Sequence, residues 1–83
     1  PSPMTPADLN SFLLRALRRK SPQTESELVL AAQNVFQSDC RTSDVQERLR
    51  DLDNKGYVTG ESDGITETTW ALTAKGQHKA KTL

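Results

Sequence analysis

The chain has 83 residues, of which 34% are hydrophobic and 5% aromatic, so we expect one small domain with a thin core. Its 11 Lys and Arg residues balance 11 Asp and Glu residues, and a net charge of zero weighs against a simple polyanion binder. A single cysteine excludes an internal disulfide, and no apolar run approaches the roughly 20 residues that cross a bilayer. We therefore expect a cytoplasmic protein without membrane contact.

The first predicted helix follows a leader at residues 1–4, which we expect to be disordered. Thr5 is a suitable cap and Pro6 a suitable first helical residue. The helix should end near Arg19, because a proline follows closely. Leu14 falls at the edge of the apolar stripe, so we expect it to be partly exposed. The stripe itself consists of Leu9, Phe12, Leu13, Ala16 and Leu17.

A second helix is predicted from a capping box formed by Thr24 and Glu27, and it should reach Asn34 or Val35. Its expected inner face is Leu28, Ala31, Ala32 and Val35. Leu30 points the other way and is a candidate contact residue, although a lone outward leucine is usually only solvated.

A third amphipathic helix follows a polar connector at residues 36–42. Ser43 is the expected N-cap, with Gln46 as its capping-box partner. Lys55 lies in the last turn and Gly56 just beyond it, as is typical of a helix C-terminus. The inward stripe is Val45, Leu49 and Leu52.

From Tyr57 onward the pattern is that of strands. Residues 57–59 make a short strand, a turn cluster follows, and residues 65–72 have the β-branched and aromatic composition of a second strand. Trp70 on the second strand should cover the helices. Thr73 can cap a last, polar helix, which we expect to fray unless a partner holds it.

This order predicts an α+β, mainly α, fold: a three-helix winged helix-turn-helix with a two-stranded antiparallel wing and a short C-terminal helix or tail. We expect the winged-helix domain to span residues 5–76 and a basic tail to span residues 77–83.

The run VQERLRDLDNKGYV at residues 45–58, with WALTAKG at residues 70–76, resembles winged-helix transcriptional regulators of the MarR and PadR kind. The resemblance implies sequence-specific binding of double-stranded DNA as a dimer, with the third helix in the major groove. Two features depart from that pattern. The spacing between Glu27 and Val45 is longer than in a tight helix-turn-helix, and the long dimerisation helices are missing. Only the leader, the first helix and the C-terminal tail are left to supply a dimer contact, and we expect possible self-association through the first helix and the tail.

The DNA-binding hypothesis assigns base contacts to the outward face of the third helix. Arg50 suits guanine and Asn54 suits adenine. The full set of base-contact candidates is Ser43, Glu47, Arg50 and Asn54. The candidates for the phosphate backbone are Arg18, Arg19, Arg41, Thr42 and Lys75. The alternative is a solvated helix face with internal ion pairs, such as Glu47 with Arg50 or Asp51 with Lys55.

The predicted wing argues against a grip on phosphates. Residues 56–74 hold no Lys or Arg but three acids, Glu61, Asp63 and Glu67, and an acidic tip repels a phosphate backbone. The basic residues cluster instead at the end of the first helix and in the tail. For the first helix, the alternative explanation is complementarity to the helix dipole.

The sequence contains few residues in patterns that indicate an enzyme. His78 is the single histidine and lies in the expected tail, and Cys40 has no neighbouring histidine. No phosphate loop, metal-ligand spacing or nucleophile elbow occurs. We predict no enzyme activity, cofactor or metal. Cys40 beside Arg41 is either a redox-sensitive thiol or an inert loop cysteine, and we favour the second.

Two functions follow from these patterns. We predict a duplex-DNA-binding, transcription-regulator-like protein. The alternative is an adaptor of the same fold that binds another protein through Leu14 and Leu30 without touching DNA, since fold alone does not fix function.

Overall fold

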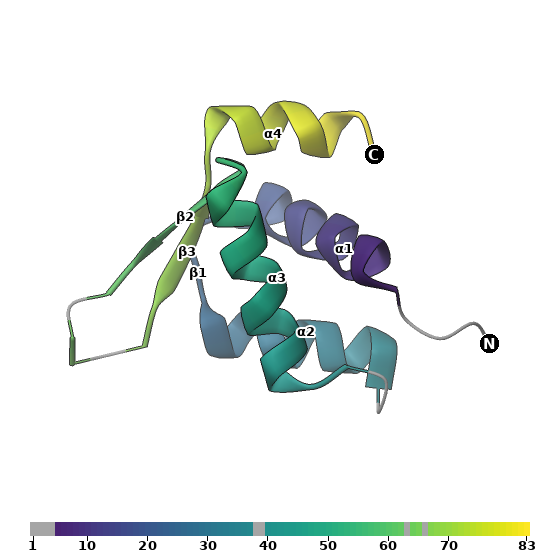
Figure 1. Ribbon diagram of the computed structural model, residues 1–83, viewed down its shortest axis with the longest axis vertical. Coiled ribbons are helices and arrows are strands. Elements are labelled where there is room, and N and C mark those ends of the chain that lie inside the picture. The colour runs from purple at the N-terminus through teal and green to yellow at the C-terminus, as the bar shows by residue number, and fades with distance from the viewer. Residues whose placement is uncertain (1–4, 38–39, 63, 66) are drawn as a thin grey trace.

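The computed structural model describes residues 5–37, 40–62, 64–65 and 67–83, so the predicted leader lies outside the described residues. Within them the helices gather on one side of a small antiparallel sheet, whose hairpin projects away from them (Figure 1). The elements in chain order are α1 (Pro6–Arg19), β1 (Gln23–Thr24), α2 (Glu25–Phe36), α3 (Thr42–Asn54), β2 (Val58–Glu61), β3 (Thr69–Leu72) and α4 (Ala74–Lys81). None of the described helices is long and apolar enough to span a bilayer.

The first two helices begin at the predicted caps. The Thr5 hydroxyl accepts from the Asp8 N–H at 3.1 Å, and the Asp8 carboxylate accepts in return from the Thr5 N–H at 3.3 Å. The Thr24 hydroxyl accepts from the Glu27 N–H at 3.2 Å. These bonds satisfy amide donors that a helix N-terminus leaves free, which is why local sequence located both helix starts.

Helix α3 begins two residues earlier than an N-cap at Ser43 requires, so Ser43 is wrong as the N-cap. Arg41 takes that position, and the Asp44 carboxylate accepts its N–H at 3.0 Å. The predicted C-terminus is confirmed: Gly56 has φ +83°. The N–H groups of Gly56 and Tyr57 donate to the carbonyls of Asp53 at 3.0 Å and Leu52 at 2.9 Å, the paired bonds of a Schellman motif.

The sheet has three strands in the order β1-β3-β2, all antiparallel. The hairpin of β2 and β3 was predicted, but β1 was not, because two residues carry no periodicity. Gln23 pairs with Trp70, and Thr24 pairs with Thr69. Strand β3 begins at Thr69, so a strand starting at Ile65 is wrong, and the Ile65 side chain is 91% exposed.

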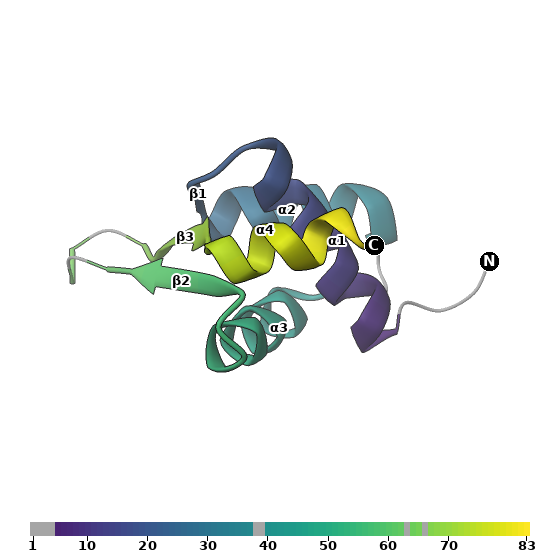
Figure 2. The ribbon, with the colours of Figure 1, turned by 90° about the horizontal axis from the view of Figure 1, so that it is seen from above.

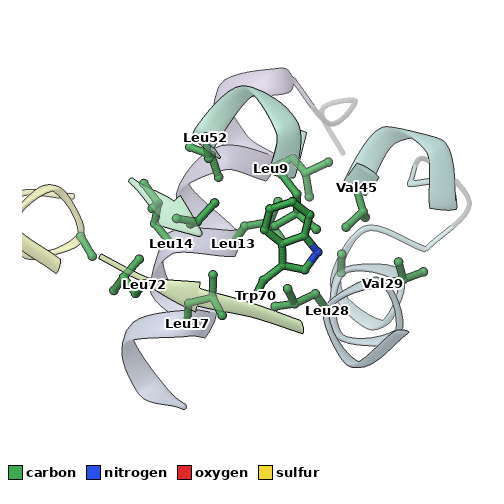
Figure 3. Packing of buried hydrophobic residues seen from close by; sticks show 14 of the residues in the cluster. Leu9, Leu13, Leu14, Leu17, Leu28, Val29, Val45, Leu52, Trp70 and Leu72 are labelled. Atoms are coloured by element: carbon green, nitrogen blue, oxygen red, sulfur yellow. The ribbon is translucent and has the colours of Figure 1, made fainter. Parts of the chain in front are cut away.

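The core lies where α1, α2 and α3 meet the inner face of the sheet, with the Trp70 indole among their leucines and valines (Figure 3). The predicted partial exposure of Leu14 is wrong, since this side chain is 2% exposed and belongs to the core. In α2 the inner face is rotated from the prediction: Val29 is buried, whereas Val35 is 58% exposed. Leu30 points outward as predicted, with 62% of its surface exposed.

Helix α4 is not a frayed tail but packs along α1 (Figure 2). Thr73 caps it as predicted, with its hydroxyl accepting from the Gly76 N–H at 3.0 Å. Ala80 is 3% exposed, so small residues let this polar helix lie close to its neighbour. The partner that holds α4 is therefore part of the same chain.

The start of α4 is joined to the end of α3. The Thr73 N–H donates to the Tyr57 carbonyl at 3.0 Å, and the Thr73 hydroxyl lies 2.6 Å from the Gly56 carbonyl. Gly76 lies so close to the Tyr57 carbonyl oxygen that a Cβ at Gly76 would meet it at 1.9 Å. The Leu-Thr-x-x-Gly sequence at residues 72–76 is thus the set of contacts that closes this joint.

Gly76→Ala should lower the free energy of unfolding by about 3 kcal/mol, the upper end of overpacking costs, because the added methyl displaces α4 from the joint. Gln77→Ala is the matched control: this exposed residue on the same helix should change stability by no more than about 0.5 kcal/mol. Urea unfolding followed by circular dichroism measures both. Equal stabilities would show that the joint does not constrain the fold.

Candidate nucleic-acid interface

The outward face of α3 is a row of free polar side chains. Ser43, Glu47, Arg50 and Asn54 are all exposed, and none of these side chains makes a hydrogen bond or ion pair with another described residue. The row spans the helix from its first turn to its last residue. Such side chains are available to a ligand, and they include both the donors and the acceptors that base edges require.

Ion pairs occupy the flank of this row rather than the row itself. Asp51 lies 3.1 Å from the Lys55 ammonium, as predicted, and 3.8 Å from the Arg48 guanidinium. No ion pair joins Glu47 to Arg50 in the part of the chain that the structure describes. Arg48 is thereby engaged within α3, whereas Arg50 is not.

The opposite face of α3 fixes the direction in which this row points. Val45 and Leu49 are fully buried and Leu52 is 2% exposed, as the predicted stripe requires. Gln46, which was expected in a capping box, instead donates from its side-chain amide to the Glu25 carboxylate on α2 at 3.3 Å. Apolar burial and this contact together hold α3 against α2.

The predicted backbone-contact residues fall into separate places. Arg41 and Thr42 are exposed at the N-terminus of α3, beside Ser43. The Lys75 ammonium donates to the Lys55 carbonyl at 3.0 Å and lies 5.3 Å from the centre of the Tyr57 ring. Lys75 therefore caps the C-terminus of α3, an intramolecular role that sequence reasoning missed.

The other two predicted backbone contacts, Arg18 and Arg19, lie far from this row. They belong to the C-terminal end of α1, which is on the opposite side of the molecule from α3 (Figure 2). There they line a groove between α1 and α4 that also includes Lys20 and Lys81. The structure thus separates the basic residues into two surfaces and does not join them into one footprint.

One acid of the predicted wing, Glu67, is hydrogen-bonded within the chain. The Glu67 carboxylate accepts from the Ser26 N–H at 3.2 Å and from the Ser26 hydroxyl. With Thr68, whose carbonyl accepts the Glu25 N–H at 3.0 Å, it occupies amide donors at the N-terminus of α2. The bonds from Ser26 lower the pKa of Glu67. Asp63 lies outside the described residues.

Cys40 and His78 are the two residues that were considered from the sequence for reactive chemistry. Cys40 is 3% exposed, and burial, with a smaller effect of the Asp44 charge, raises the pKa of its thiol. A protonated, buried thiol fits the inert rather than the redox-sensitive interpretation. His78 is exposed on α4. The described residues include no group of three or more His, Cys, Asp or Glu side chains placed to hold a metal ion.

The order helix, strand, two helices and hairpin, with the three-stranded sheet, is that of a winged helix-turn-helix domain. No known protein family matches the sequence, and no curated protein is detectably similar to it. Among solved structures, a mutant of ZitR from Lactococcus lactis superposes with a TM-score of 0.72 at 16% sequence identity. The match covers 89% of this chain and 47% of the ZitR chain, so this chain spans about half of that length.

The likeness to ZitR supports the predicted fold class. The structure of this chain itself adds the two elements that were missed or underestimated, β1 and α4. At 16% identity the superposition shows similarity of fold alone. The resemblance to the MarR and PadR regulators stays a prediction.

The contact between Glu67 and α2 should make stability depend on pH. A carboxyl whose pKa is lowered by folding stabilises the folded state above its ordinary value of 4.5, and this contribution is lost as pH falls through the lowered value. Glu67→Gln should therefore lower the melting temperature at pH 7, with the difference from wild type shrinking below about pH 4.

Glu61→Gln is the control for this measurement. Glu61 is an exposed acid at the end of β2 whose side chain makes no hydrogen bond to a described residue. Its replacement should leave the melting temperature almost unchanged across the same pH range. A wild-type-like melting profile for Glu67→Gln would contradict a role for Glu67 in holding α2.

Proposed function

We propose that this chain is a double-stranded-DNA-binding protein, similar to transcriptional regulators, that inserts α3 into the major groove. The observation that carries the proposal is the row of exposed, unpartnered polar side chains along α3, set on a winged helix-turn-helix domain. A helix held by its apolar face against the domain, with its polar face free, is the arrangement that reads base edges in proteins of this architecture.

Each residue of the row suits a particular contact. Arg50 can donate two hydrogen bonds to guanine, Asn54 can pair with adenine, and Glu47 can accept from the amino group of cytosine. Ser43 at the N-terminal end can reach a base or a phosphate. Arg41 and Thr42 at the start of α3 are the nearest candidates for the phosphates that flank the groove.

The oligomeric contact predicted from sequence fits this structure poorly. A dimer formed through α1 and α4 would place the cations at the end of α1 against those of a second copy. Like charges across an interface cost several kcal/mol. We therefore place a dimer contact, where one forms, outside the surface shared by α1 and α4.

Arg50→Ala should lower affinity for the preferred sequence by about 1–3 kcal/mol and relax the preference at one base position. Selection of bound sequences from a random duplex pool, repeated with the variant, measures the effect. Arg48→Ala is the matched control, because Arg48 lies on the same helix but is engaged with Asp51. The control should keep the wild-type preference.

Two results would overturn the proposal. One is the absence of binding to any duplex at about 50 mM salt, where the electrostatic contribution is large. The other is an identical selected sequence for wild type and Arg50→Ala, which would remove α3 as the reading element.

A second candidate function rests on Leu30. This side chain is 62% exposed on α2, whereas Leu14, the other predicted contact, is in the core. In an adaptor that binds protein through α2, Leu30→Glu should release the partner in a pull-down, with the melting temperature unchanged because the side chain is not packed. Retention of the partner by Leu30→Glu would count against the adaptor.

A further inference from the structure

The zero net charge of the chain conceals a strong separation of charge. Residues 5–20 and 74–83, which contain α1 and α4, hold seven of the 11 Lys and Arg residues and only one of the 11 acids, a balance of plus six. Residues 21–73, which contain α2, α3 and the sheet, hold the other ten acids and four bases, a balance of minus six. Because α1 and α4 pack side by side, the positive half is one continuous part of the molecule.

Five of these cations form what we call the basic face: Arg15, Arg18, Arg19, Lys20 and Lys81. All five side chains are exposed, and they line two adjoining grooves at the C-terminal end of α1. One groove lies against α4, the other against α2, and Arg19 and Lys20 border both. No carboxylate is among the residues that line either groove.

The end of α1 does not need these cations for its own stability. The Gln23 side-chain amide already donates to the carbonyls of Ala16 at 2.9 Å and Lys20 at 2.7 Å. Lys20 makes one solvent-exposed ion pair, 3.7 Å from the Glu27 carboxylate, of a kind that contributes little. Within the described chain, Arg15, Arg18, Arg19 and Lys81 make no ion pair.

We propose that the basic face is a second nucleic-acid-binding surface, which holds the phosphate backbone without regard to sequence. Arg18 and Arg19 follow Arg15 by three and four positions on one helix, a spacing that places the Cβ atom of each about 5–6 Å from that of Arg15. The groove against α4 adds two neutral donors, the Ser21 hydroxyl and the Gln77 amide. Cations mixed with hydroxyl and amide donors are the set that binds phosphate oxygens.

A membrane surface fits this face less well. Helices that lie in a bilayer interface bury large apolar side chains beside their cations. Helix α4 has the sequence AKGQHKAK and offers none. The cations and polar donors of the basic face themselves indicate nucleic acid as the ligand. This inference does not depend on whether α3 contacts bases.

The last turn of α1, which carries Arg18 and Arg19 of the basic face, lies on the opposite side of the domain from α3 (Figure 2). The domain measures 21 Å along its shortest axis, and Figure 2, which is turned by 90° from the view down that axis, shows the end of α1 and α3 separated along it. A straight duplex lying in contact with α3 therefore leaves the basic face open. The basic face would hold a second segment of duplex, so that one domain bridges two.

The test compares two triple variants that change the net charge equally. Arg18→Gln/Arg19→Gln/Lys81→Gln removes three cations from the basic face, and Arg41→Gln/Arg48→Gln/Arg50→Gln removes three from α3. Affinity for a short random-sequence duplex is measured by fluorescence anisotropy between about 50 and 200 mM KCl. The basic-face variant should flatten the slope of log affinity against log salt by about 3, since each phosphate contact contributes about one. The α3 variant should flatten it much less.

Two readouts on the intact chain complement the variants. In an amide chemical-shift titration, random duplex should shift signals from the C-terminal half of α1 and from α4. In a capture assay, wild type bound to an immobilised duplex of selected sequence should retain a second, labelled duplex, and the basic-face variant should not.

Equal salt slopes for the two triple variants, or no shifts at α1 and α4, would overturn the proposal. Equally tight binding of a polyglutamate peptide in place of duplex would overturn it in favour of an acidic protein partner. Failure of the α3 hypothesis is a separate result, seen as an unchanged sequence preference in Arg50→Ala, and it leaves the salt-slope comparison intact.

Discussion

The carbonyl group of Tyr57 is the point on which the arrangement of this domain depends. It accepts the Thr73 N–H at 3.0 Å, and the close approach of Gly76 leaves no room for a side chain there. The Tyr57 N–H in turn closes the C-terminus of α3. The backbone of a single residue, Tyr57, thus connects the end of α3, the beginning of β2 and the first turn of α4. The direction of the α3 polar row, the origin of the wing and the placement of α4 on α1 are all set by it.

Local sequence predicted most of what local physics decides, with the N-cap of α3 as the exception. The caps at Thr5, Thr24 and Thr73, the glycine after α3 and the inward stripe of α3 each depend on residues within one or two turns, and each is confirmed. The prediction that Leu14 is partly exposed was wrong, because the burial of a side chain depends on every element that packs against its helix. Helix α1 is packed by α2, α3, β3 and α4, so a wider part of its surface is covered than one apolar stripe indicates.

The residues of the candidate site could be predicted from the sequence, but the contacts that surround them in the folded chain could not. The exposure of Ser43, Glu47, Arg50 and Asn54 followed from helical periodicity. By contrast, the roles of Glu67 and Lys75 depend on contacts across 41 and 20 residues of sequence, with Ser26 and with the Lys55 carbonyl. Both were interpreted as surface charges, one repelling and one attracting phosphate. In the folded chain, both stabilise helix ends, so neither is a simple guide to nucleic-acid affinity.

Net charge is a weak argument in a domain of this shape. The inference from a neutral total to a poor polyanion binder assumes that opposite charges are close enough to cancel at the surface. At physiological salt, electrostatic interactions fade over about 8 Å. The domain is 21 Å across even in its thinnest direction, and its positive and negative halves are gathered on different elements. A phosphate near the end of α1 therefore responds mainly to the cations of the basic face, and apart from Glu27 beside Lys20 the acids of the wing, α2 and α3 do little to offset them.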